Sequence, residues 1–168
     1  NKISNFTRSK YAIGTISGTA ALHIALKILG VNQNEEVLLP SFAFVAAANA
    51  ILYNSAIPHF VDCELNQFGV DPIKLEKYLK KNTIVKKNKC INLKTNRIIK
   101  AIIIVHIFGH PAKIRKLLKI AKKFKLKVVE DAAEALGSLY LKKHVGTFGD
   151  VGVLSFNGNK IITTGMGG

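Results

Sequence analysis

The sequence predicts an α/β fold in which a mainly parallel sheet is flanked by helices. Short apolar runs of strand length alternate with segments of helical periodicity along the 168 residues, which is the pattern that βαβ units produce. The run from Ala101 to His106 is rich in β-branched residues, as in a central parallel strand that is buried on both faces. A hydrophobic fraction of 48% with 21% charged residues is typical of one globular domain with its own core.

In the first half of the chain, apolar runs and capping residues define five elements. Ser17-Gly18-Thr19 opens the first helix and Gly30 closes it. Asp71 is the expected N-cap of a later amphipathic helix, which has Pro72 at its first position. We expect helices at 20–29, 42–53 (buried) and 72–81, and strands at 36–39 and 58–61.

In the second half, an insertion interrupts the alternation before the central strand. Two short apolar runs flank Lys94-Thr95-Asn96, which predicts a small hairpin at about 88–100. A helix follows with apolar residues on one face and lysines on the other, as in a crossover helix with a solvated basic face. We expect this helix at 113–125, further strands at 101–106, 127–130, 138–141 and 151–156, and a turn or short helix at 132–133.

Basic residues are concentrated in one segment of the chain. The protein has a formal net charge of +15, and residues 74–127 hold 18 of its 25 basic residues with a single acidic residue, Glu76. Lysine outnumbers arginine there, whereas base and phosphate recognition favours the arginine fork, and no aromatic residues recur at regular spacing for stacking. We expect a solvated surface and no nucleic-acid partner. The alternative, a basic nucleic-acid-binding protein, predicts steeply salt-dependent binding.

We expect neither a signal peptide, nor a membrane span, nor a metal site. Residues 1–12 lack a long apolar core. Residues 37–61 carry no charged side chain and are long enough to cross a bilayer, but prolines and asparagines interrupt them and acidic residues flank them. A buried strand–helix–strand explains them better. Cys63 and Cys90 are too few and too far apart for a disulfide framework or a zinc site, and we expect a cytoplasmic protein.

Polar residues lie where an open α/β sheet binds ligands, beyond the carboxyl ends of its strands. Asp131 ends one expected strand, and the segment containing Lys160 follows another. Ser17-Gly18-Thr19 opens a helix whose free amides and dipole favour a phosphate. Pyridoxal phosphate requires such a cradle, a lysine amine to bond its aldehyde, and a carboxylate to keep its pyridine nitrogen protonated. Taken singly, each feature has an ordinary structural explanation as a cap, a turn residue or a surface lysine.

These features become specific when they are taken together, because they fall in five segments that follow one another in a fixed order. They are SGTAALH at 17–23, LPSFAFVA at 39–46, VHIFGHP at 105–111, EDAAEALG at 130–137, and GD at 149–150 followed by SFNGNK at 155–160. The chain thereby resembles the DegT/DnrJ/StrS family of pyridoxal-phosphate-dependent sugar aminotransferases. The NLKTNR insert at 92–97 and the SFNGNKIITTG segment at 155–165 resemble most the branch that acts on UDP-4-keto-6-deoxy-N-acetylhexosamines.

The resemblance implies a role for four residues around the cofactor ring. Lys160 would hold the cofactor covalently and then carry a proton between the amino-acid carbon and the cofactor. Asp131 would pair with the pyridine nitrogen, and Glu134 would lie near the ring hydroxyl. Phe44 stands where the family places its ring-stacking aromatic residue.

The resemblance also implies a phosphate site at the start of the first helix. Thr19 and Ala20 would bind the phosphate through the helix N-terminus, and Ser155 would add a hydroxyl group. His106 would lie close to the cofactor, with no catalytic role assigned; a satisfied histidine at the end of a strand is an equal alternative.

The implied reaction moves an amino group from an amino acid, expected to be glutamate, to a nucleotide-linked 4-keto sugar in surface-polysaccharide biosynthesis. The implied assembly is a homodimer in which the neighbouring chain completes the phosphate pocket. Residues 1–168 are then expected to be a partial large domain of fold type I, similar to that of aspartate aminotransferase, without the C-terminal small domain. The alternative is a truncated relative without activity, which the coding sequence beyond Gly168 would distinguish.

Overall fold

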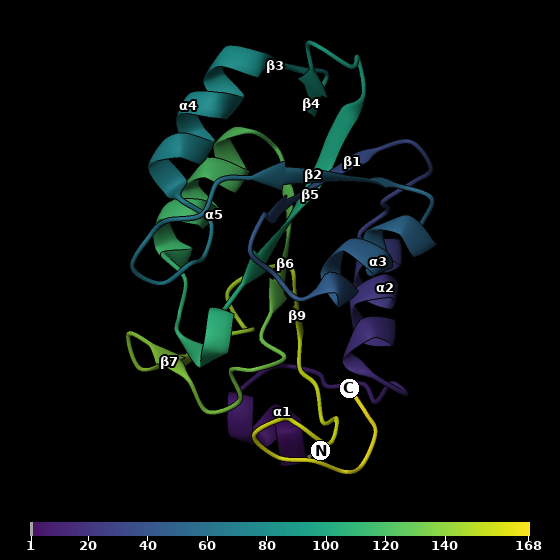
Figure 1. The fold of residues 1–168 in the computed structure, drawn as a ribbon, viewed down its shortest axis with the longest axis vertical. Helices are drawn as coiled ribbons and strands as arrows, with labels where there is room; N and C mark the ends of the chain where they lie inside the picture. Colours follow the sequence, from purple (N-terminus) through teal and green to yellow (C-terminus); the bar gives the residue numbers. More distant parts are fainter. Residues whose placement is uncertain (1) are drawn as a thin grey trace.

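The computed structural model describes residues 2–168, in which one sheet lies between two layers of helices (Figure 1). Five parallel strands form the body of the sheet, in the order β2-β1-β5-β6-β9. They are β1 Glu36–Pro40, β2 Ile57–Val61, β5 Ile98–Val105, β6 Lys127–Asp131 and β9 Val151–Val153. The expected α/β class with a mainly parallel sheet is confirmed.

Two pairs of helices cover the two faces of this sheet (Figure 1). Their bounds are α2 Gly18–Ile28 and α3 Val45–Tyr53 on one face, and α4 Pro72–Asn82 and α5 Ile114–Lys123 on the other; α1 Lys2–Thr7 lies near the chain termini. Side chains of β5 alternate between two apolar clusters: Ile102 and Ile104 pack on the side of α4 and α5, and Ile103 packs on the side of α2 and α3. This burial on both faces explains the continuous apolar run in the sequence.

The predicted hairpin is present and is fastened to the sheet by a buried carboxylate. β4 (Lys89–Asn92) pairs antiparallel with the first residues of β5, and β3 (Thr83–Lys86), which the sequence did not predict, pairs with β4. Glu36 accepts hydrogen bonds from Asn92 (2.9 Å), Thr95 (2.6 Å) and His59 (2.7 Å). Burial alone would raise the pKa of Glu36, but these hydrogen bonds outweigh it and the pKa is lowered.

Two expected elements are shorter than predicted. The helix expected over 42–53 begins only at Val45, and it is not buried as a whole, because Val45, Leu52 and Tyr53 are 59%, 55% and 61% exposed. Phe44 is extended, and the Phe42 amide donates to Cys63 Sγ at 3.3 Å, which holds this segment out of the helix. The strand expected over 151–156 ends at Val153, where the chain leaves the sheet.

A smaller difference concerns the strand expected at 138–141. It is the two-residue strand β7 (Leu139–Tyr140), which pairs antiparallel with β8 (Lys143–His144) outside the main sheet. The expected turn at 132–133 is present.

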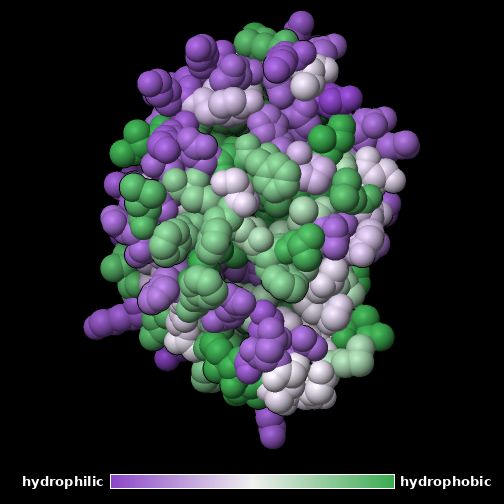
Figure 2. Space-filling view, viewed as in Figure 1, coloured by the Kyte–Doolittle hydropathy of each residue, from purple (hydrophilic) through white to green (hydrophobic). Residues whose placement is uncertain are grey.

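The lysine-rich segment forms a hydrophilic end of the molecule, over α4 and the hairpin (Figure 2). Glu76 on α4 accepts from Lys80 (3.2 Å) and from Lys123 of α5 (2.8 Å). Lys116 and Lys119 point from α5 into solvent. The charge-free residues 37–61 form β1, α3 and β2, and no helix within residues 2–168 is long and apolar enough to cross a membrane.

Candidate active site

The candidate site lies beyond the carboxyl ends of the parallel strands, toward the part of the molecule where both termini are found (Figure 1). Parallel strands end at a common edge, so the segments after β1, β5, β6 and β9 meet there. The N-terminus of α2 reaches the same edge, because residues 15–17 pair with residues 167–168 after β9. The sheet thus gathers all five segments that carry the sequence motifs.

Lys160 lies in the loop after β9 and points into this edge. Its Nζ is 3.1 Å from Glu134 Oε1 and 5.8 Å from the centre of the Phe44 ring, and its side chain is only 12% exposed. The loop is held by its own backbone: the Phe156 amide donates to Gly167 (2.9 Å), and the Thr164 amide donates to Phe156 (3.0 Å). Three predicted site residues from separate segments therefore meet at one amine.

Asp131 is the last residue of β6 and is buried beside the same amine. One of its carboxylate oxygens accepts from the Ala133 amide at 3.1 Å. Burial raises the pKa of the Asp131 carboxyl, and the Ala133 hydrogen bond and the charge of Lys160 oppose this only in part. Within residues 2–168 that amide is its sole hydrogen-bond donor, so the carboxylate has room for a cationic N–H, as a protonated pyridine nitrogen supplies.

The predicted phosphate-binding residues lie around the first turn of α2. Ser17 caps the helix by accepting the Ala20 amide at 3.1 Å, and the Thr19 amide has no acceptor in the described part of the chain. A Cβ on Gly18 would lie 2.9 Å from the Ser155 Cβ and 3.1 Å from its Oγ. The Ser155 hydroxyl therefore sits against the open helix end, where amides favour an anion.

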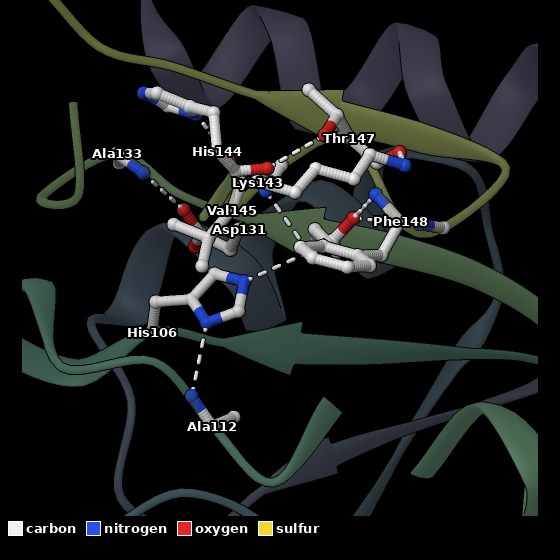
Figure 3. A network of polar contacts seen from close by, with 12 residues as sticks. His106, Ala112, Asp131, Ala133, Lys143, His144, Val145, Thr147 and Phe148 are labelled. Atoms are coloured by element: carbon white, nitrogen blue, oxygen red, sulfur yellow. Dashed lines mark hydrogen bonds and ion pairs between the residues drawn. The ribbon is translucent and has the colours of Figure 1, made fainter. Parts of the chain in front are cut away.

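His106 is a fully satisfied buried histidine. Its Nδ1 accepts the Ala112 amide at 3.1 Å, so Nε2 carries the proton and donates to Glu130 Oε2 at 3.0 Å. Figure 3 shows the ring between Ala112 and the segment of Phe148, with Asp131 nearby. The His106 amide also donates to the Asp131 carbonyl at 3.0 Å. Of the two alternatives for His106, the structure supports the satisfied histidine at the end of a strand, beside Asp131.

Glu130 holds several segments together beside the candidate site, a role that the sequence did not predict. Besides His106, its carboxylate accepts the amides of Gly146 (2.9 Å), Phe148 (2.5 Å) and Gly149 (2.6 Å). Burial alone would raise the pKa of Glu130, but the bonds from His106 and the glycine amides outweigh it and the pKa is lowered. Two features of the sequence could have pointed to this role: Glu130 directly precedes Asp131, and glycines recur in the later turn at 146–149 whose amides bind it.

A family model described as the DegT/DnrJ/EryC1/StrS aminotransferase family matches residues 1–168, and the chain belongs to this family. It is 39% identical over 168 residues to the GDP-perosamine synthase of Escherichia coli O157:H7, covering 100% of this chain and 42% of that protein. The fold superimposes on a DegT DnrJ EryC1 StrS aminotransferase from Brucella abortus with a TM-score of 0.87 and 30% identity, covering 99% of this chain and 42% of that one.

A further solved relative carries a cofactor. NtdA from Bacillus subtilis, with bound cofactor PMP, matches with a TM-score of 0.81 and 32% identity over 98% of this chain and 33% of its own. The chain thus spans less than half the length of each of these relatives. The family and the pyridoxal-phosphate-dependent transferase fold expected from the sequence are confirmed, whereas similarity to a GDP-perosamine synthase does not single out the UDP-sugar branch.

Proposed function

We propose that this chain is the cofactor-binding part of an aminotransferase that delivers an amino group to a nucleotide-linked keto sugar. The observation that carries the proposal is the meeting of Lys160 with Glu134, the face of Phe44 and the buried Asp131 at one edge of the sheet. An amine, a buried carboxylate and an aromatic face are the three groups that a pyridoxal phosphate site requires.

Each side chain has a distinct task in this proposal. When bound, pyridoxal phosphate supplies an aldehyde and a ring that accepts negative charge from the amino-acid carbon. Lys160 would hold the cofactor through its Nζ, and the same amine would then carry a proton between the amino-acid carbon and the cofactor. Asp131 would keep the proton on the pyridine nitrogen, Phe44 would cover one face of the ring, and Glu134 would lie near the ring hydroxyl.

The helix end supplies the anchor for the phosphate. The Thr19 amide has no acceptor among residues 2–168, and the Ser155 hydroxyl lies against Gly18. The Ala20 amide bonds Ser17, and in the proposal it turns to the phosphate, a stronger acceptor than a hydroxyl. The helix dipole adds to the attraction.

The proposed substrates are glutamate as amino donor and a nucleotide-linked 4-keto sugar as acceptor. Within that class, the NLKTNR segment at 92–97 in the hairpin and the SFNGNKIITTG segment around Lys160 support a UDP-4-keto-6-deoxy-N-acetylhexosamine as the substrate. We further propose a cytoplasmic homodimer in which the second copy completes the phosphate pocket, as the family resemblance implies.

The test is the visible absorption of the chain mixed with pyridoxal phosphate, compared with Lys160→Ala. Lys119→Ala is the matched control, because that lysine is exposed on α5. We expect wild type and the control to develop a shifted visible band, and borohydride to fix the cofactor at residue 160 in peptide maps. Added glutamate should then bleach the band as the amino group moves to the cofactor.

Identical spectra for wild type and Lys160→Ala would overturn the proposal. A band that forms but does not respond to glutamate, aspartate or alanine would refute the amino-transfer step while leaving the cofactor site intact.

A further inference from the structure

Three phenylalanine rings form an exposed cluster, here called the aromatic rim, which consists of Phe42, Phe68 and Phe108. The Phe42 ring centre lies 5.5 Å from that of Phe68 and 6.2 Å from that of Phe108, with interplanar angles of 47° and 70°. The three residues are 48%, 46% and 67% exposed. Apolar residues remain uncovered across the middle of the face in Figure 2. These rings contact one another but do not contribute to the buried core.

The backbone holds two of the three rings in an unfavourable conformation. Phe68 has φ of 59° and Phe108 has φ of 50°, which is the left-handed region that bulky side chains rarely adopt. Such strain persists only where the surrounding structure enforces it, and it gathers at ligand sites. Leu141, 62% exposed and away from the rim, has a similar φ of 49°, so the conformation shows that the two rings are held in place, and their ligand is argued from their position.

The aromatic rim is connected directly to the proposed active site. The Phe108 amide donates to Glu134 Oε2 at 3.1 Å, while Oε1 of the same carboxylate binds Lys160. Phe42 is two residues from Phe44, and its amide is fixed on Cys63 Sγ. The rings therefore lie beside the proposed active site, with the Glu134 carboxylate between the Phe108 amide and Lys160 Nζ.

Resting on the function proposed above, we propose that the aromatic rim is the stacking platform for the base of the nucleotide-linked sugar. The keto carbon must reach the cofactor held at Lys160, so the base, at the other end of the substrate, extends away from Lys160 toward exposed surface such as the aromatic rim. A planar base stacks on aromatic rings without fixed polar partners, and the tilted rings offer faces in more than one direction. This recognition tolerates different bases, so the rim supplies affinity for a nucleotide rather than discrimination between nucleotides.

The experiment measures nucleotide binding to the chain loaded with pyridoxal phosphate, by calorimetry. The probes are UDP, GDP and inorganic pyrophosphate, which lacks a base. The variants Phe42→Leu and Phe108→Leu keep an apolar side chain without an aromatic face. Phe60→Leu is the control, since Phe60 is 58% exposed and makes no ring contact within residues 2–168.

We expect each rim variant to weaken UDP and GDP binding about tenfold, with pyrophosphate binding and the Phe60→Leu control unchanged. Equal affinity of wild type and rim variants for UDP, or an equal loss for pyrophosphate, would overturn the proposal. So would a change in oligomeric state without a change in nucleotide affinity, which would assign the rim to an interface between copies. Absence of UDP binding by a wild-type chain that still captures the cofactor at Lys160 would refute the rim alone and leave the proposed function standing.

Discussion

Replacement of Glu130 by glutamine tests whether one buried carboxylate supports the candidate site. The two side chains have the same shape, and Glu130 is fully buried. Its Oε1 accepts two amides, from Phe148 and Gly149, and its Oε2 accepts the Gly146 amide and the His106 ring. All four partners are donors. A glutamine can satisfy one pair through its oxygen, but its NH2 group then faces the other pair.

The magnitude follows from those two unmatched donors. A buried donor without an acceptor costs about 1–3 kcal/mol, so Glu130→Gln is expected to lose about 2–6 kcal/mol of unfolding free energy. This is a large part of the roughly 5–15 kcal/mol that stabilises an ordinary domain. With a denaturant slope of about 2 kcal/mol/M, the urea midpoint falls by about 1–3 M.

Urea unfolding followed by circular dichroism at neutral pH measures the loss. Glu76→Gln is the matched control, since Glu76 bonds only exposed lysines on the surface, and its midpoint is expected to stay close to that of wild type. A shift of less than about 0.5 M for Glu130→Gln would refute the hydrogen-bond assignment.

Acid provides a second readout of the same carboxylate. The pKa of Glu130 is lowered in the folded protein, so the stability due to its charge is fully present above the unfolded value of about 4.3 and is lost as pH falls through the folded pKa. The difference in stability between wild type and Glu130→Gln is therefore expected to shrink below about pH 4. A difference that stays constant through acid titration would contradict a charged acceptor at this position.

Two further substitutions probe the attachment of the hairpin and the packing of β9 against the turn at Gly146. Glu36→Ala removes the acceptor of His59, Asn92 and Thr95. We expect the unfolding free energy to fall by about 2–4 kcal/mol and amide hydrogen exchange to become faster in the hairpin than in β6. Equal exchange rates in the two elements would contradict the role of Glu36 in fastening the hairpin. Gly152→Ala would place a Cβ 1.8 Å from the Gly146 carbonyl oxygen; thermal melts should show a loss of about 3 kcal/mol or more, whereas Gly158→Ala, with open space around it, should melt like wild type.

The order and class of the elements could be predicted because local rules and burial agree in this chain. Asp71 caps α4 as expected, its Oδ1 accepting the Ile73 (2.8 Å) and Lys74 (3.1 Å) amides. The apolar run of β5 is buried between two helical layers. The site segments were also predictable, because parallel strands bring their carboxyl ends to one edge whatever the loops do.

Errors arose where long-range contacts override local pattern. The run from Phe42 to Tyr53 is apolar except for Asn49, yet Phe44 is extended and the Phe42 amide contacts Cys63, 21 residues away, so the helix begins only at Val45. The strand expected to reach Phe156 ends early, because the Phe156 amide bonds Gly167 and not a neighbouring strand. Periodicity contains no information about either partner.

The part of the candidate site that the sequence does not reveal is the set of hydrogen bonds made by Glu130 and His106. The sequence predicted Lys160, Asp131 and Phe44 as site residues, but it did not predict the hydrogen bond that joins Glu130 to His106 beside Asp131. Both lie at strand ends, both are buried, and each bonds the backbone of another segment. Because Asp131 follows Glu130 directly and accepts the His106 amide through its carbonyl, we expect that a change that loosens this pair also moves the Asp131 carboxylate, which we propose pairs with the cofactor. The proposed site therefore predicts that stability and cofactor binding fall together in variants of Glu130 and His106, which is checked by measuring both in each variant.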